Sequence, residues 1–292
     1  MALPDDVKPN RQQGKTPVSV AVLIVNFNSG RLLSKCLHLV CAQTCRPERV
    51  IVVDNASSDG SVDGVERDYP GVEVLRLGQN RGFAAANNLA AQQAGAVEWL
   101  ALLNPDAFPE PDWLERWLAV AEAHPDCASF GACLVDARDP QRLDGTGDVY
   151  HVSGLAWRRD HGRLALEGQR AGDEIFAPCA AAALYRRTAF WEAGGFDEDY
   201  FCYFEDVDLG FRLRLLGYGC RHVPEAVVRH VGSAVTGRRS PFSLYHGHRN
   251  LVWTWWKNMP GLLFWRYLPH HLLLNLGSVL WYALRGRGSV LL

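Results

Sequence analysis

The feature that most constrains the fold is an alternation of short apolar runs with helical segments over the first hundred residues. Strand-like runs occupy positions 18–25, 50–53, 72–75 and 99–103, and helix-like segments occupy 31–42 and 83–94. The first run is apolar apart from Ser19 and rich in valine, so it suits a strand that is buried on both faces of a sheet. Strands that alternate with helices predict βαβ units and a doubly wound α/β sheet, mainly parallel, with helices on both faces.

Polar side chains follow three of these runs. Asn26 and Asn28 follow the first, Asp54 follows the second, and Asn104 and Asp106 follow the fourth. In doubly wound sheets, ligands bind beyond the carboxyl ends of the strands, near the point where the strand order reverses. We therefore expect these five side chains to converge on one binding crevice.

Two common phosphate-binding loops are missing from the sequence. No GxGxxG follows the first strand and no GxxxxGK[ST] occurs in the chain, which argues against dinucleotide-binding and P-loop proteins. A nucleotide bound here would have its phosphates neutralised most simply by a divalent cation on carboxylates. Asp106 is the candidate ligand because it follows a buried strand and a proline. A turn-initiating aspartate is the structural alternative.

An acidic cluster lies at the start of a predicted helix. Glu205, Asp208 and Arg212 share one helical face, and the last two are spaced for an ion pair. Asp206 points elsewhere, which makes it the candidate for a carboxylate that accepts a proton. The alternative is a cluster that serves only the helix dipole. The aromatic residues around it favour a site, because solvated charge clusters rarely need so many rings.

His230 lies in an apolar run at 227–233. A lone histidine in such a run is usually a hydrogen-bonded core residue. Alternatively, its imidazole completes a metal site with Asp106, which would be acceptable to Mn²⁺ and poorer for Mg²⁺. Both interpretations stay open on the residues alone.

Taken together, the motifs resemble family 2 glycosyltransferases with the GT-A fold, especially the bacterial rhamnosyltransferase-like branch. The resemblance covers residues 18 to about 240, with the motifs in the order of the family. The matching stretches are VLIVNFNSG (22–30), VIVVDNASSDGS (50–61), NRGFAAANN (80–88), LLNPDA (102–107), GGFDEDYFCYFEDVDLGFRLRLLGYG (194–219) and RHVGSA (229–234).

The resemblance implies an enzyme that transfers a sugar from a nucleotide diphosphate and inverts its anomeric centre. The favoured donor is dTDP-L-rhamnose, and the acceptor is a hydroxyl of a lipid-linked or cell-surface glycan. Asp54 would bind the base or ribose, with Asn26 and Asn28 beside it. Asn80 and Arg81 would form a second nucleotide-contacting stretch, in which the arginine is suited to a phosphate.

The resemblance also assigns the metal and the catalytic base. Asp106 and His230 would hold Mg²⁺ or Mn²⁺ on the diphosphate, and Asp206 would be the base. The Asp-x-Asp motif of the family reads Asn-Pro-Asp here, so Asn104 replaces one carboxylate and the metal has one fewer charged ligand. Three neighbours of the base are expected to support the site or face the acceptor: Glu205, Asp208 and Arg212.

The C-terminal region differs in charge from the rest of the chain. The formal net charge is −2, yet eight basic residues and no acidic ones follow Glu225, together with five of the ten tryptophans. Residues 261–284 are mostly apolar, but Arg266 and Pro269 are among the interruptions that leave too short a run to span a bilayer. A cationic, amphipathic helical tail at 241–292 suits the headgroup layer of an anionic membrane. A cap packed on the catalytic domain is the alternative.

These observations predict three parts: a disordered lead-in at 1–16, a GT-A domain at 17–240 and the tail. The eight cysteines lack paired spacing and the N-terminus lacks the apolar stretch of a secretory signal. We therefore expect a cytoplasmic protein that is peripheral on the inner face of the cell membrane.

The expected partners are a nucleotide diphosphate sugar, a lipid-linked glycan acceptor and an anionic membrane surface, and a homodimer is compatible with the sequence. Nucleic acid is not expected, because no recognised motif accompanies the basic residues. Three alternatives remain: a non-catalytic nucleotide-sugar or glycan-binding module at the membrane, a transferase that uses a UDP-sugar, and a nucleotidyltransferase.

Overall fold

The computed structural model describes residues 19–165, 173–232 and 240–286 of the chain, so the expected lead-in at 1–16 lies outside the described residues. The expected strands and helices of the first hundred residues are confirmed to within two residues of their bounds. This part of the chain forms β1 Val20–Asn26, α1 Arg31–Cys41, β2 Arg49–Asp54, α2 Val65–Asp68, β3 Val72–Arg76, α3 Gly82–Gln93 and β4 Trp99–Leu103.

The elements that follow vary more in length. They are β5 Ala107–Pro109, α4 Trp113–Ala123, β6 Cys127–Asp136, β7 Leu143–Gly145, β8 Asp148–Tyr150, β9 Ala156–Arg158, β10 Ala182–Arg186, α5 Arg187–Glu192, a 3₁₀ turn Glu198–Tyr200, α6 Glu205–Leu215, β11 Gly219–His230, α7 Pro241–Asn258 and α8 Gly261–Leu284.

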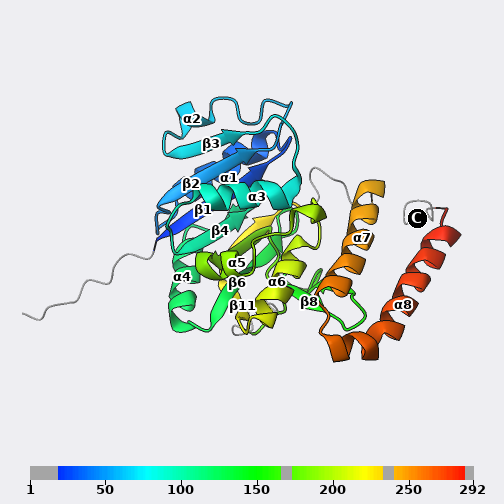
Figure 1. Cartoon of the computed structure of the whole chain (residues 1–292). Coiled ribbons are helices and arrows are strands. Elements are labelled where there is room, and N and C mark those ends of the chain that lie inside the picture. The colour runs from blue at the N-terminus through cyan, green and yellow to red at the C-terminus, as the bar shows by residue number, and fades with distance from the viewer. Residues whose placement is uncertain (1–18, 166–172, 233–239, 287–292) are drawn as a thin grey trace, which may run out of the picture.

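One nine-stranded sheet runs through the described residues in the order β3-β2-β1-β4-β10-β6-β11-β5, with β7 paired to β6 (Figure 1). β3, β2, β1 and β4 are parallel. The chain passes from β1 to β2 and β3 on one side and reaches β4 on the other, so the strand order reverses at β1. Beyond β4 the sheet is mixed, because β10 is antiparallel to both of its neighbours. The expected parallel arrangement therefore holds for the N-terminal half.

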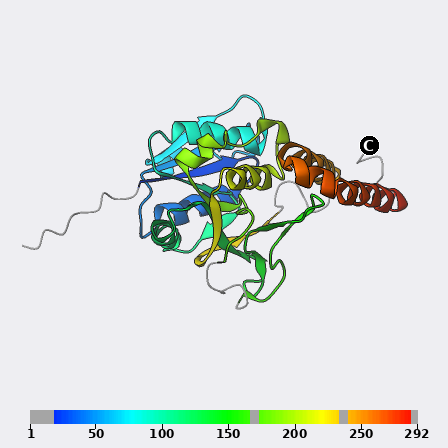
Figure 2. The same ribbon diagram turned by 60° about the horizontal axis from the view of Figure 1, so that its bottom comes forward.

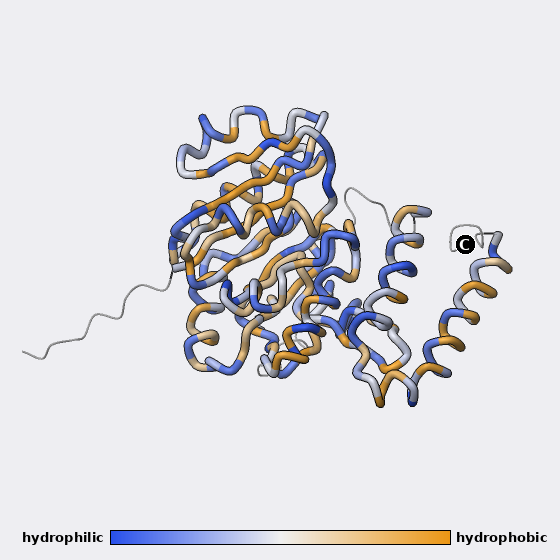
Figure 3. Tube along the Cα trace, in the orientation of Figure 1, coloured by the Kyte–Doolittle hydropathy of each residue, from blue (hydrophilic) through white to orange (hydrophobic). Residues whose placement is uncertain are grey.

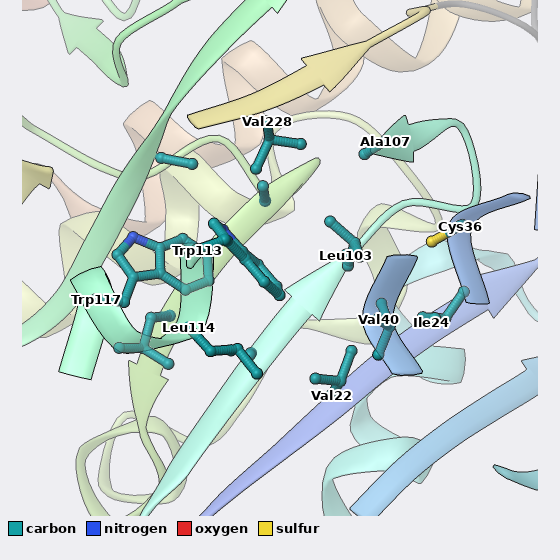
Figure 4. Close-up of a cluster of buried hydrophobic side chains, with 14 of the residues drawn as sticks. Val22, Ile24, Cys36, Val40, Leu103, Ala107, Trp113, Leu114, Trp117 and Val228 are labelled. Carbon is teal, nitrogen blue, oxygen red and sulfur yellow. The ribbon is translucent and has the colours of Figure 1, made fainter. Parts of the chain in front are cut away.

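Helices cover both faces of the sheet (Figure 2). Alternate residues of β1 point to opposite sides, so that Val22 and Ile24 pack with α1 and α4, while Leu23 packs with α3, α5 and α6. Figure 4 shows the first of these clusters, in which the rings of Trp113 and Trp117 lie 4.5 Å apart. Two buried layers therefore fix the strand ends, from which the loops of the site begin.

The two C-terminal helices differ in their surroundings. α7 packs against α6, whereas α8 extends away from the body of the protein (Figures 1 and 2). Apolar residues recur along α8 (Figure 3), and those exposed include Leu262, Trp265 and Leu284. Across the described ranges, none of the helices combines the length and the hydropathy that crossing a bilayer requires.

Candidate active site

A cavity of about 990 Å³ opens at the carboxyl ends of the parallel strands. The loops after β1, β2 and β4 line one side of it, and β8, β9 and the start of α6 line another. Residues at the start of α7 also reach the cavity. Its volume lies at the upper end of the range of about 300–1,000 Å³ for small-molecule sites, which suits a ligand as large as a nucleotide sugar.

Asn26 and Asp54 are paired across β1 and β2 by the strand register. Both are buried, and Asn26 Nδ2 donates hydrogen bonds to Asp54 Oδ1 at 3.1 Å and to the hydroxyls of Ser57 and Ser61 at 3.0 and 2.9 Å. Asn28 binds the same loop through its backbone N–H and its side-chain carbonyl. None of the three expected nucleotide contacts lines the cavity. They hold the loop after β2 in place, and their contact with a nucleotide stays a prediction.

Asn55 joins that loop to α3, although it was not among the expected residues. Its Nδ2 donates to Asn80 Oδ1 at 2.9 Å and to the carbonyl of Gly82 at 3.2 Å, and its Oδ1 accepts the backbone N–H of Arg81 at 2.8 Å. Asn55 and Asn80 line the cavity, whereas the Arg81 side chain is 47% exposed outside the lining. The signal for Asn55 is its place directly after a buried strand end.

The two expected metal ligands are brought together by strand pairing. β11 is antiparallel to β5 with His230 opposite Ala107, so that His230 Nε2 lies 3.5 Å from Asp106 Oδ1. On the other side of the ring, His230 Nδ1 lies 2.7 Å from Asp144 Oδ2, which also binds Arg158. A carboxylate that holds Nδ1–H orients the ring and leaves Nε2 available to a metal.

Electrostatics support this arrangement. Burial by itself raises the pKa of Asp144, but the His230 hydrogen bond and the charge of Arg158 outweigh it and lower that pKa to about 2. Burial by itself lowers the pKa of His230. Its hydrogen bonds to Asp106 and Asp144 outweigh burial, so the pKa of His230 is raised above its ordinary value. In the part of the chain that the structure describes, no group of three or more His, Cys, Asp or Glu residues could hold a metal. Two protein ligands fit a cation that phosphate and water also bind.

The start of α6 places two carboxylates in the cavity, Glu205 and Asp206. Glu205 was expected to support the site or face the acceptor, and its place in the cavity lining agrees with that expectation. Its role there stays a prediction. Asp206 accepts hydrogen bonds from the backbone N–H groups of Ala180 and Val207, each at 2.9 Å. Glu205 Oε2 is buried without a hydrogen-bond partner.

Asp148, on β8, also lines the cavity, beside Asp106, Glu205 and Asp206, and was not expected from the sequence. Burial raises the pKa of Asp206, whereas two backbone N–H groups and Arg158 oppose the rise. Burial and the charge of Asp206 raise the pKa of Glu205 and of Asp148 well above their ordinary range. The pKa of Asp206 ends above its ordinary value because burial outweighs the opposing contacts. The two N–H groups and Arg158 still stabilise its charged form, which is the state that accepts a proton.

Asp208 and Arg212 form the expected ion pair, with Nη2 and Oδ2 2.7 Å apart. Neither residue lines the cavity. Asp208 is fully buried, and its Oδ1 accepts hydrogen bonds from the Tyr200 hydroxyl at 3.1 Å and from Asn258 of α7 at 2.7 Å. The pair thus connects α6 to α7, and a contact with the acceptor stays a prediction.

The reversal of strand order beside a cavity lined by carboxylates and a histidine agrees with the expected GT-A fold. The sequence model of Glycosyl transferase family 2 matches residues 21–194. The N-acetylglucosaminyl-diphospho-decaprenol L-rhamnosyltransferase of Mycobacterium tuberculosis is 31% identical over 255 residues, which cover 78% of this chain and 81% of the relative. The chain therefore belongs to glycosyl transferase family 2 and is a rhamnosyltransferase-like glycosyltransferase.

Solved structures agree on the fold. GalNAc-T7 with UDP, GalNAc and Mn²⁺ has a TM-score of 0.66 at 16% identity, and the match covers 82% of this chain and 48% of that one. The mannosyltransferase PcManGT from Pyrobaculum calidifontis, in complex with GDP-Man and Mn²⁺, has a TM-score of 0.61 at 21% identity. This match covers 93% of this chain and 73% of the mannosyltransferase. Both neighbours are thus glycosyltransferases that were solved with Mn²⁺.

Proposed function

We propose that this glycosyltransferase moves L-rhamnose from dTDP-L-rhamnose to a hydroxyl of a lipid-linked glycan, with inversion at the anomeric carbon and with a divalent cation. The observation that carries the proposal is the shared cavity of Asp206 and the Asp106–His230 pair. A base and a diphosphate site must face the same anomeric carbon if the nucleophile attacks opposite the leaving group. The relative that is named for rhamnosyl transfer to a decaprenol-linked sugar supports the donor and the acceptor class.

The roles of the side chains follow from the chemistry of inversion. An acceptor hydroxyl is a weak nucleophile, so Asp206 accepts its proton while the new C–O bond forms and the bond to the diphosphate breaks on the opposite side. Asp106 and His230 would hold Mg²⁺ or Mn²⁺, which stabilises the negative charge of the leaving diphosphate. Asp144 fixes the His230 ring, and Arg158 binds Asp144 and favours the charged form of Asp206.

The lipid-linked acceptor places the enzyme at a membrane surface, which we propose to be the cytoplasmic face. The exposed apolar side chains of α8 support contact with a membrane, since Leu262 is 90% exposed, Trp265 72% and Leu284 87%. No acidic residue follows Glu225, so the tail complements an anionic headgroup layer.

The test uses the full chain with polyprenyl-diphosphate-linked N-acetylglucosamine, Mn²⁺ or Mg²⁺, and either dTDP-L-rhamnose or UDP-sugars. We expect a rhamnosylated product with the anomeric configuration opposite to that of the donor, and no turnover in chelator. Asp206→Asn should lower kcat by about 10³-fold, within the range typical of a lost general base. Asp126→Asn, at an exposed carboxylate outside the cavity lining, is the matched control.

Each result bears on a separate part of the proposal. Retained kcat in Asp206→Asn would show that another group takes the proton. Turnover of a UDP-sugar in place of dTDP-L-rhamnose would overturn the donor assignment. A product with the configuration of the donor would exclude a single in-line displacement.

A further inference from the structure

The loop at 201–204 leads directly into Glu205 and Asp206 and has an unusual backbone. Phe201, Tyr203 and Phe204 have φ angles of +64°, +68° and +67°. Side chains disfavour this left-handed region, so such residues persist only where the surrounding structure holds them. All four loop residues line the cavity. The conformation of this loop therefore determines the positions of Glu205 and Asp206 in the cavity.

The side chain of Asn250, on α7, forms several hydrogen bonds with this loop and the residue before it. Asn250 is fully buried. Its Nδ2 lies 3.0, 2.9 and 2.7 Å from the carbonyl oxygens of Tyr200, Cys202 and Tyr203. Its Oδ1 accepts a hydrogen bond from Arg249 at 2.9 Å, and the same guanidinium donates to the Tyr200 carbonyl at 2.9 Å. The carbonyls of the strained loop thus converge on one amide group.

The same loop also contacts the donor side of the site. The carbonyl of Phe201 accepts the backbone N–H groups of Phe83 and Ala84, at 2.6 and 3.2 Å, in the first turn of α3. A Cβ on Gly82 would lie 2.6 Å from the Phe201 ring, so the two segments touch closely. Loop 201–204 therefore joins α3, α6 and α7.

The face of α7 that carries Asn250 is polar although it is buried. Asn250, Thr254 and Asn258 follow one another at intervals of four residues and are at most 6% exposed. Thr254 Oγ1 lies 3.0 Å from the Tyr200 hydroxyl, and Asn258 Nδ2 donates to Asp208. Buried polar groups with satisfied hydrogen bonds specify one arrangement of the elements that they join. These hydrogen bonds thereby fix the position of α7 relative to the first turn of α6 and the residues before it.

We propose that Asn250 is a positioning residue for glycosyl transfer, which holds the Asp206 carboxylate in place through loop 201–204. The proposal rests on the role of Asp206 as the base. It makes α7 part of the catalytic arrangement, although α7 lies beyond residues 21–194, which the family model matches. The metal pair, Asp106 and His230, comes from other elements. A change at Asn250 should therefore lower the rate of transfer much more than it weakens donor binding, which it can reach only through the contact of the loop with α3.

The test replaces the amide in the full-length enzyme. Asn250→Asp keeps the side-chain shape, removes both N–H donors and places a carboxylate against three carbonyls. We expect kcat to fall about 100-fold, the size of effect that a displacement of about 1 Å produces. The KM for dTDP-L-rhamnose and the thermal shift that it causes with Mn²⁺ should stay within about threefold and a few degrees of wild type.

The control makes the same chemical change on α8, where Asn275→Asp affects an amide whose hydrogen bonds go to His271. It should keep the wild-type kcat. If the aspartate variant does not fold, Asn250→Ser replaces it in the test. The serine keeps one short hydrogen-bond donor, and we expect its kcat to be about tenfold below wild type. Folding is checked by circular dichroism and by the stoichiometry of donor binding.

A double variant separates positioning from a general loss of structure. If Asn250 acts through Asp206, Asp206→Asn combined with Asn250→Asp should be no slower than Asp206→Asn alone, within about threefold. A folded, donor-binding Asn250→Asp or Asn250→Ser enzyme with wild-type kcat would overturn the proposal, and so would losses that multiply in the double variant. Activity retained by Asp206→Asn alone would instead contradict the proposed function.

Discussion

Asp144→Asn is the substitution that most directly tests the electrostatics of the site. Asp144 is 4% exposed, and its carboxylate is bound by His230 Nδ1 at 2.7 Å and by Arg158. The amide keeps the shape of the side chain but carries no charge. His230 therefore keeps at most a neutral acceptor for Nδ1–H in place of a charged one, and Arg158 loses its closest counter-ion.

The expected magnitude follows from the pKa of Asp144, which the site lowers from 3.8 to about 2. At about 1.4 kcal/mol per pKa unit, the charged form contributes about 2 kcal/mol to folding at neutral pH. Because the pKa is lower in the folded protein, this contribution is complete above pH 3.8. It disappears as the pH falls towards 2.

Urea unfolding of wild type and Asp144→Asn at several pH values measures this contribution. We expect the free energies of unfolding to differ by about 2 kcal/mol at pH 7 and to converge between about pH 4 and pH 2. Mn²⁺ affinity in the presence of dTDP should fall 10–100-fold at pH 7, as for other partners of ligating histidines. The exposed control Asp126→Asn should change stability by less than about 0.5 kcal/mol. A difference that stays constant down to pH 2 would refute the electrostatic explanation.

Three further predictions concern the core, the loop contact and α8. Trp117→Ala should destabilise the fold by about 3–5 kcal/mol in urea unfolding, because the indole is fully buried. Gly82→Ala should lower both stability and kcat, since φ is +84° and the added Cβ meets Phe201 at 2.6 Å. Leu273→Gln with Leu276→Gln should reduce flotation with anionic vesicles while transfer to a water-soluble acceptor stays unchanged, and equal flotation would contradict the membrane role of α8.

The N-terminal half was predictable because its signals are local. The runs that became β1, β2, β3 and β4 are short, apolar and followed by polar residues, and each of these features depends on neighbours in sequence. The antiparallel position of β10 was not predictable in this way. It depends on pairing with Trp99–Leu103, about eighty residues earlier, and no periodicity within β10 itself specifies its partner.

The site was predictable where residues follow strand ends and less so elsewhere. Asp106, Asp206 and His230 do line one cavity. Asn55 was missed although it directly follows the buried end of β2. Asp148 was missed because a single Asp in a short strand carries no signal until a distant segment faces it. Burial, together with the charge of Asp206, raises the pKa of Asp148, and both the burial and the proximity are properties of the fold.

The tail shows what a composition argument leaves out. Charge and tryptophan content distinguish residues 241–292 from the rest of the chain. Both quantities are totals over the segment, so they do not show in which direction each side chain points. In α7 the buried face carries Asn250, Thr254 and Asn258, whose hydrogen bonds go to loop 201–204, Tyr200 and Asp208. In α8 many apolar side chains are exposed, although Phe264 packs against Trp255 of α7. Within one segment, α7 thus packs on the catalytic domain while α8 exposes apolar side chains, and contact of α8 with a membrane stays a prediction.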